Sequence, residues 1–107
     1  MKKKVVVLGA GLVGKAIAID MAKNFDVTSV DINNEALLTL EPYGIGTMKA
    51  DLQDVETLSN LVQPFDLVIG AVPGFMGFRT VRAIIEAGKN MVDISFFPED
   101  PFRRAFT

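Results

Sequence analysis

The chain has 107 residues, half of them hydrophobic, and a formal net charge of -2, so we expect one domain over residues 1–107. It contains neither cysteine nor histidine, which excludes disulfides, thiolate chemistry and the most common general base and metal ligand. No apolar run reaches the roughly 20 residues of a membrane helix, and the only basic run, Lys2 to Lys4, lies at the extreme start, so the sequence predicts a cytoplasmic protein with no membrane or nucleic-acid partner and no metal.

The first third of the chain alternates between short apolar runs and helical periodicity. Residues 5–8 are a continuous β-branched run, which is typical of a strand buried on both faces. The apolar residues of 12–23 fall on one stripe and predict an amphipathic helix. A second strand is predicted over 27–30 and ends at Asp31.

The same alternation continues to the end of the chain, with less contrast. Asparagines at positions 33 and 34 would cap a short helix that stops before Pro42. Asp54 would cap a helix that ends at Pro64. The remaining predicted elements are strands over 44–48, 65–71 and 91–94 and a helix over 78–87 with Gly88 as its stop.

Alternating strands and helices with short connections require a parallel sheet with right-handed crossovers. We therefore expect an α/β fold, a Rossmann-type doubly wound parallel sheet in three α/β/α layers. About five strands would be arranged in the order 3-2-1-4-5.

A glycine-rich stretch follows the first predicted strand and opens the first predicted helix. Gly9, Gly11 and Gly14 have the spacing G-x-G-x-x-G in the context that a dinucleotide-binding loop requires. The first glycine permits the tight turn, the second lets the backbone approach a pyrophosphate, and the third allows close packing of helix on strand. The helix N-terminus then offers free N–H groups to the phosphates.

Asp31 ends the second predicted strand, 22 positions after Gly9. A carboxylate there can accept hydrogen bonds from both ribose hydroxyls of the adenosine half, whereas a 2′-phosphate would meet a like charge. Ile32 and the two asparagines after it supply no arginine to offset that charge. The sequence therefore favours NAD as the cofactor over NADP.

Two further loops would lie at the same edge of the sheet. Asp51 and Leu52 follow the third strand, where they would either contact the adenine ring or form only a capping turn before Asp54. The small residues of 70–74 leave the fourth strand beside the switch point of the sheet and leave room for the nicotinamide ribose, with the loop fixed by Pro73.

Four stretches together resemble the saccharopine dehydrogenase family, most of all its lysine 6-dehydrogenase-like members. They are the glycine loop, Ala50-Asp51-Leu52, Ala71-Val72-Pro73-Gly74-Phe75-Met76-Gly77 and Met91-Val92-Asp93-Ile94-Ser95-Phe96. The glycine loop is shared by many dehydrogenases, whereas the third and fourth stretches are more particular. The resemblance covers roughly residues 3 to 102.

The resemblance implies an NAD(P)-dependent oxidoreductase that acts on the carbon–nitrogen bond of an amino acid such as lysine or saccharopine. In that family a second domain supplies most of the substrate pocket and the dimer interface, so this chain alone would be the cofactor domain and inactive. Asp93 is the candidate for proton transfer, with a turn-capping carboxylate as the alternative. The expected cofactor-binding residues are Gly9, Gly11, Leu12, Val13, Gly14, Asp31, Ile32, Asp51, Leu52, Ala71, Val72 and Pro73.

An alternative from another class is a non-catalytic NAD-sensing domain, of the kind that regulates potassium transport. Such domains share the glycine loop and the strand-end acid but usually carry polar residues after the fourth strand, where this chain has Val72 to Met76. The dehydrogenase interpretation is therefore favoured.

Residues 96–107 show no clear hydrophobic period. They are either a C-terminal tail or the start of a substrate domain. Their four phenylalanines cannot all enter the core, so we expect them to mark a face for a partner domain or a second copy of the chain. These residues are Phe96, Phe97, Phe102 and Phe106.

Overall fold

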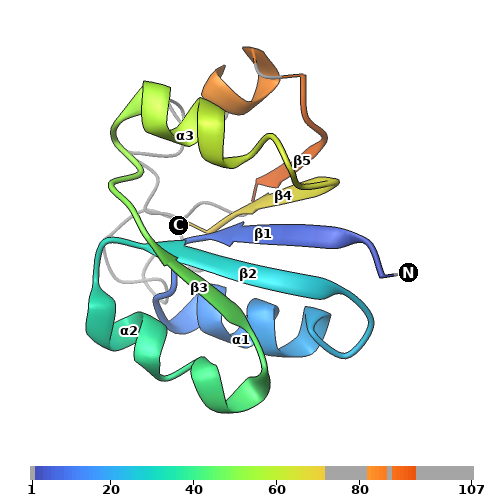
Figure 1. The fold of residues 1–107 in the computed structure, drawn as a ribbon, viewed down its shortest axis with the longest axis vertical. Helices are drawn as coiled ribbons and strands as arrows, with labels where there is room; N and C mark the ends of the chain where they lie inside the picture. Colours follow the sequence, from blue (N-terminus) through green and yellow to red (C-terminus); the bar gives the residue numbers. More distant parts are fainter. Residues whose placement is uncertain (1, 72–81, 87, 94–107) are drawn as a thin grey trace, which may run out of the picture.

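The computed structural model describes residues 2–71, 82–86 and 88–93. They form a parallel sheet of five strands in the order β3-β2-β1-β4-β5, with helices on both faces (Figure 1). This confirms the predicted Rossmann-type α/β fold, its three layers and its strand order. The strands are β1 (Lys4–Leu8), β2 (Asp26–Asp31), β3 (Gly46–Lys49), β4 (Leu67–Gly70) and β5 (Met91–Asp93).

The sheet is built around β1, whose apolar run is buried on both faces. Val5, Val6, Val7 and Leu8 are all 0% exposed, and β1 pairs with β2 on one side and with β4 on the other. Because all five strands are parallel, their carboxyl ends lie at one edge of the sheet. Every loop in which a functional residue was predicted leaves the sheet at this edge.

One face of the sheet is covered by α1 (Leu12–Met21), α2 (Asn34–Leu38) and the short 3-10 helix η1 (Glu41–Tyr43), below the sheet in Figure 1. The opposite face is covered by α3 (Val55–Leu61) and the helical residues 82–86. Each face has its own apolar core. The first contains Val5, Val7, Ala18, Val27, Leu37 and Ile69, and the second contains Val6, Leu8, Val30, Leu58, Val68 and Ile84.

Helices α2 and α3 begin at side chains that cap them in the same way. The Oδ1 atom of Asn33 accepts from the N–H groups of Glu35 and Ala36 at 2.9 and 3.2 Å. The Oδ1 atom of Asp54 accepts from those of Glu56 and Thr57 at 3.1 and 3.3 Å. Both caps were predicted, and they explain how two helices of five and seven residues are defined at their starts.

The boundaries of the elements between α2 and β3 differ from the prediction because these residues form a 3-10 turn. Pro42 does not simply end a helix but stands inside η1, since proline fits the first turn of a helix. Gly44, predicted to start the third strand, adopts a left-handed φ of 74° as the C-cap of η1, and β3 begins only at Gly46.

Three further boundaries were predicted too wide or lie partly outside the described residues. Helix α1 ends at Met21, two residues before the predicted end. Strand β4 begins at Leu67, because the preceding N–H of Phe65 donates to Val62 in the turn after α3. Of the predicted helix 78–87, only 82–86 is described, followed by Gly88 with a positive φ of 75°. Among the described helices none is long and apolar enough to cross a bilayer.

The Asp54 cap makes the stability of the fold depend on pH in the acid range. Hydrogen bonds from the backbone and side chain of Thr57 hold the pKa of Asp54 below its ordinary 3.8. Its contribution to the free energy of unfolding is therefore complete above that value and is lost as the pH falls through the lowered pKa. We expect Asp54→Asn, which keeps the Oδ1 acceptor, to flatten this acid-dependent loss. Urea unfolding at pH 2.5 to 7 would measure it, and identical pH profiles for the two proteins would contradict the expectation.

Candidate functional site

The turn after β1 depends on a glycine at its first position. Gly9 has a φ of 106°, a conformation that residues with a Cβ rarely adopt. Its N–H donates to the carbonyl of Val30 on β2 at 2.7 Å, so the turn stays attached to the neighbouring strand. The chain then enters α1 within three residues.

Gly14 lies in the first turn of α1 directly against this loop. A Cβ at Gly14 would overlap the carbonyl oxygen of Gly9, and it would lie 2.9 Å from the carbonyl carbon and 3.4 Å from the Cβ of Ala71. The third glycine of the spacing is therefore required by the close approach of α1 to the ends of β1 and β4.

Gly11, by contrast, faces open space. A Cβ built on it would meet nothing within 4 Å, and its φ of -70° suits any residue. Gly11 is the N-cap of α1, and no side chain makes a cap hydrogen bond there, unlike at α2 and α3. Among the residues that the structure describes, no side chain caps or covers the N-terminus of α1, so its backbone N–H groups are arranged as in sites that bind phosphates.

Asp31, at the end of β2, joins this loop to the next one. Its Oδ2 atom accepts from the N–H of Ala10 at 2.7 Å, and its Oδ1 atom accepts from the N–H of Asn33 at 2.9 Å. Asp31 is half-buried. Each carboxylate oxygen can accept a second hydrogen bond, so the carboxylate can hold both loops and still receive two ribose hydroxyls.

Of the two predicted site residues after β3, Asp51 has an exposed side chain and Leu52 a buried one. The Oδ1 atom of Asp51 accepts from the N–H of Gln53 at 2.9 Å, so Asp51 forms a turn before Asp54, and its contact with an adenine ring stays a prediction. Leu52 is only 7% exposed and belongs to the core between the sheet and α3. The segment is attached to the site through its backbone, because the N–H of Ala50 donates to the carbonyl of Asp31 at 3.1 Å.

The last part of the predicted site is only partly described. Ala71 is buried, and its N–H donates to the carbonyl of Leu8 at 2.8 Å, which fixes the end of β4 beside the glycine loop. Val72 and Pro73 lie outside the described residues, as do all four phenylalanines of the tail. Asp93 ends β5, but its side chain is likewise outside the description.

Three apolar side chains of the predicted site are exposed around the open helix end. Leu12 is 89%, Val13 42% and Ile32 60% exposed. Leu12 and Val13 follow Gly11 at the start of α1, and Ile32 follows Asp31. Apolar side chains that gather around a set of polar donors and acceptors are typical of a ligand-binding surface.

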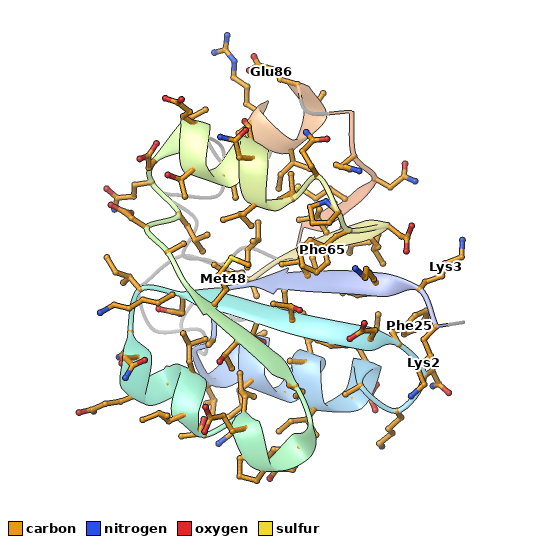
Figure 2. All side chains as sticks on the ribbon, in the orientation of Figure 1. Lys2, Lys3, Phe25, Met48, Phe65 and Glu86 are labelled. Atoms are coloured by element: carbon orange, nitrogen blue, oxygen red, sulfur yellow. The ribbon has the colours of Figure 1, made fainter. Side chains whose placement is uncertain are left out.

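The lysine run at the start of the chain takes no part in this site. Figure 2 shows Lys2, Lys3 and Phe25 at the end of the sheet where β1 begins, opposite the glycine loop. Within the described part of the chain, no group of acidic or histidine side chains could hold a metal ion.

Sequence reasoning missed two features of the site. It assigned no role to Ala10, which acts through its backbone N–H and so leaves no trace in the residue type. It also overlooked Lys49, which pairs in register with Asp31. Only the observed start of β3 at Gly46 places that lysine at the strand end.

The surroundings of Gly14 and Gly11 predict a large and a small loss of stability, respectively, for one added methyl group. Gly14→Ala forces the loop and α1 apart, so we expect it to lower the free energy of unfolding by about 1–3 kcal/mol or more. Gly11→Ala adds its methyl group to open space, so its cost should stay below about 1 kcal/mol, the scale of an N-cap change. Urea denaturation of both variants measures the difference, and equal costs would contradict the observed geometry.

Residues 5–105 match the family model described as the saccharopine dehydrogenase NADP binding domain. The chain is 30% identical over 99 residues to the mitochondrial alpha-aminoadipic semialdehyde synthase of Rattus norvegicus. The aligned region covers 89% of this chain and 11% of the rat protein.

Many solved structures show the same fold, and two of them serve as examples. One is the apo saccharopine dehydrogenase (L-Glu forming) of Saccharomyces cerevisiae, with a TM-score of 0.79, 23% identity, 97% of this chain covered and 24% of that one. The other is AtPrR2 with NADP+ and (+)pinoresinol, with a TM-score of 0.69, 24% identity, 84% of this chain covered and 35% of that one. The chain thus spans a small part of each relative. It belongs to the saccharopine dehydrogenase NADP binding domain family.

Proposed function

We propose that this chain binds a nicotinamide dinucleotide across the carboxyl ends of β1, β2 and β4, as the cofactor domain of an oxidoreductase that acts on the carbon–nitrogen bond of an amino acid. The observation that carries the proposal is the Asp31 carboxylate, which accepts from the backbone of the glycine loop at 2.7 Å and so stands beside the open start of α1. Family membership supports the same assignment.

The pyrophosphate would lie against Gly11 and the uncapped start of α1. There the free N–H groups and the helix dipole favour negative charge, and the bare Cα of Gly11 allows close approach. Leu12 and Ile32 would become covered when the site fills, which accounts for two large apolar side chains in water. When bound, the nicotinamide would supply hydride transfer, and the protein supplies position and electrostatics.

The adenosine ribose would lie over Asp31, and this placement favours NAD. The carboxylate can accept from both ribose hydroxyls, whereas a 2′-phosphate brings a second negative charge against it. The carboxylate is tied to Ala10 and Asn33, so it cannot turn away. The family model carries the name of NADP, and AtPrR2 is seen with NADP+, so a preference for NAD would be a particular property of this chain.

The substrate would be an amino acid of the lysine or saccharopine type, bound together with a second domain. The relatives carry this domain as a small part of a longer chain, since it makes up 11% of the rat protein and 24% of the yeast enzyme. We propose a single domain over residues 1–107 that has little activity by itself, with Asp93 as the candidate for proton transfer. We also propose that the protein is cytoplasmic and that the phenylalanines of the tail contact a partner domain or a second copy of the chain.

Ligand-dependent stability tests the proposal directly. NADH at about 100 times its Kd should raise the free energy of unfolding by about 2.7 kcal/mol, because it binds only the folded chain. NADPH should raise it less at the same concentration, and ATP should have little effect. Gly11→Ala should remain folded and lose the NADH effect, because its methyl group occupies the place of the pyrophosphate. Thermal melts with each nucleotide measure these effects, and a chain that responds to none of them would refute the proposal.

A further inference from the structure

Strand register brings a lysine next to the residue that governs the choice of cofactor. Lys49 is the last residue of β3 and pairs in register with Asp31, the last residue of β2. Residues paired in register on neighbouring parallel strands point to the same face, and neighbouring strands are about 4.8 Å apart. Lys49 therefore leaves the sheet on the same side as Asp31.

That side is the one on which the glycine loop lies. Val30, one residue before Asp31, packs into the core on the α3 face, so Asp31 points to the α1 face, where it meets the N–H of Ala10. Ala10 itself packs into the core on that face. The lysine and the carboxylate thus share the edge of the sheet over which the adenosine ribose would lie.

The ammonium group of Lys49 is not engaged by a carboxylate of the described residues. Lys49 is exposed, and the ion pairs in this part of the chain join Lys23 to Asp20 and Arg82 to Glu86. Asp31 gives its two oxygens to backbone N–H groups and forms no ion pair with Lys49. As far as the described residues go, the lysine can receive another anion beside Asp31.

The other described cations lie elsewhere or act on both nucleotides alike. Lys4 begins β1 and Lys89 precedes β5, so both lie at the far end of the parallel strands, and Arg82 lies in the helical residues on the opposite face of the sheet. Lys2 and Lys3 lie at the opposite end of the sheet (Figure 2), and Lys23 lies just beyond the C-terminal end of α1. Lys15 is in the first turns of α1, where its charge would act on the pyrophosphate that NADH and NADPH have in common. Lys49 alone in this part of the chain lies next to Asp31 in strand register.

We propose that Lys49 is the residue that sets how well a 2′-phosphorylated dinucleotide is tolerated. Its ammonium group would pair with the 2′-phosphate and offset the repulsion from Asp31, while NADH, which has only a hydroxyl there, would gain nothing from it. This inference rests on the proposed binding of a dinucleotide. It makes the choice between the two cofactors a balance of two opposite charges on neighbouring strand ends.

The test is the ratio of the Kd values for NADPH and NADH, measured by fluorescence titration of the whole chain at fixed ionic strength. Lys49→Ala should raise the Kd for NADPH by about three- to fivefold, the scale of one exposed ion pair, and change the Kd for NADH by less than about twofold. Lys49→Arg should keep the ratio of the unsubstituted chain. Lys49→Glu should raise the ratio further than Lys49→Ala.

Lys23→Ala is the matched control, because it removes the same charge from an exposed lysine remote from the site and should leave the ratio unchanged. An unchanged ratio in Lys49→Ala, an equal change for both nucleotides, or NADPH binding too weak to measure in the unsubstituted chain would overturn the role of Lys49 but leave the proposed function intact. Failure of the unsubstituted chain to bind either nucleotide would overturn both. Circular dichroism confirms that the exposed substitutions leave the fold unchanged.

Discussion

The carboxylate of Asp31 connects the parts of the site that the sheet alone does not connect. Its two oxygens accept from Ala10 and from Asn33, at 2.7 and 2.9 Å, and so tie the glycine loop to the turn that opens α2. An asparagine could not do this, because its amide presents one acceptor and one donor group. At Asn33 and Asp54, by contrast, a single oxygen accepts both N–H groups, and an amide serves as well as a carboxylate.

The position of that carboxylate follows from the burial of β1. A strand that is 0% exposed at four successive residues must lie in the middle of a parallel sheet with helices on both faces. The glycine loop therefore emerges between β2 and β4, and Gly14 allows α1 to return close to the carbonyl of Gly9. One edge of the sheet therefore holds the open start of α1, the carboxylate of Asp31 and the end of β4. Ligands of doubly wound parallel sheets bind in a crevice at this edge.

The fold, the helix caps and the turn made by the glycines were accessible from the sequence because they depend on local patterns. The buried run at 5–8, the caps at Asn33 and Asp54 and the spacing of the glycines are local signals of this kind. The order of the strands was expected from the type of fold that these signals indicate, and the structure has that order. The start of β3 was not accessible, because Gly44 belongs to the turn and only its left-handed φ reveals this. The pairing of Lys49 with Asp31 depends on that boundary, and a shift of one residue would place the lysine on the other face.

We expect Asp31 to hold the dinucleotide site in its binding geometry before a ligand arrives. Amide resonances of the free, isotope-labelled chain test it most directly. In the unsubstituted chain the N–H groups of Ala10 and Asn33 should be protected from exchange with solvent, and Asp31→Asn should shift both and expose at least one of them, whereas Asp54→Asn should leave them unchanged. NADH should then perturb the same two amides in the unsubstituted chain. Amides of Ala10 and Asn33 that are unprotected from the start, or that Asp31→Asn leaves unaltered, would contradict the account.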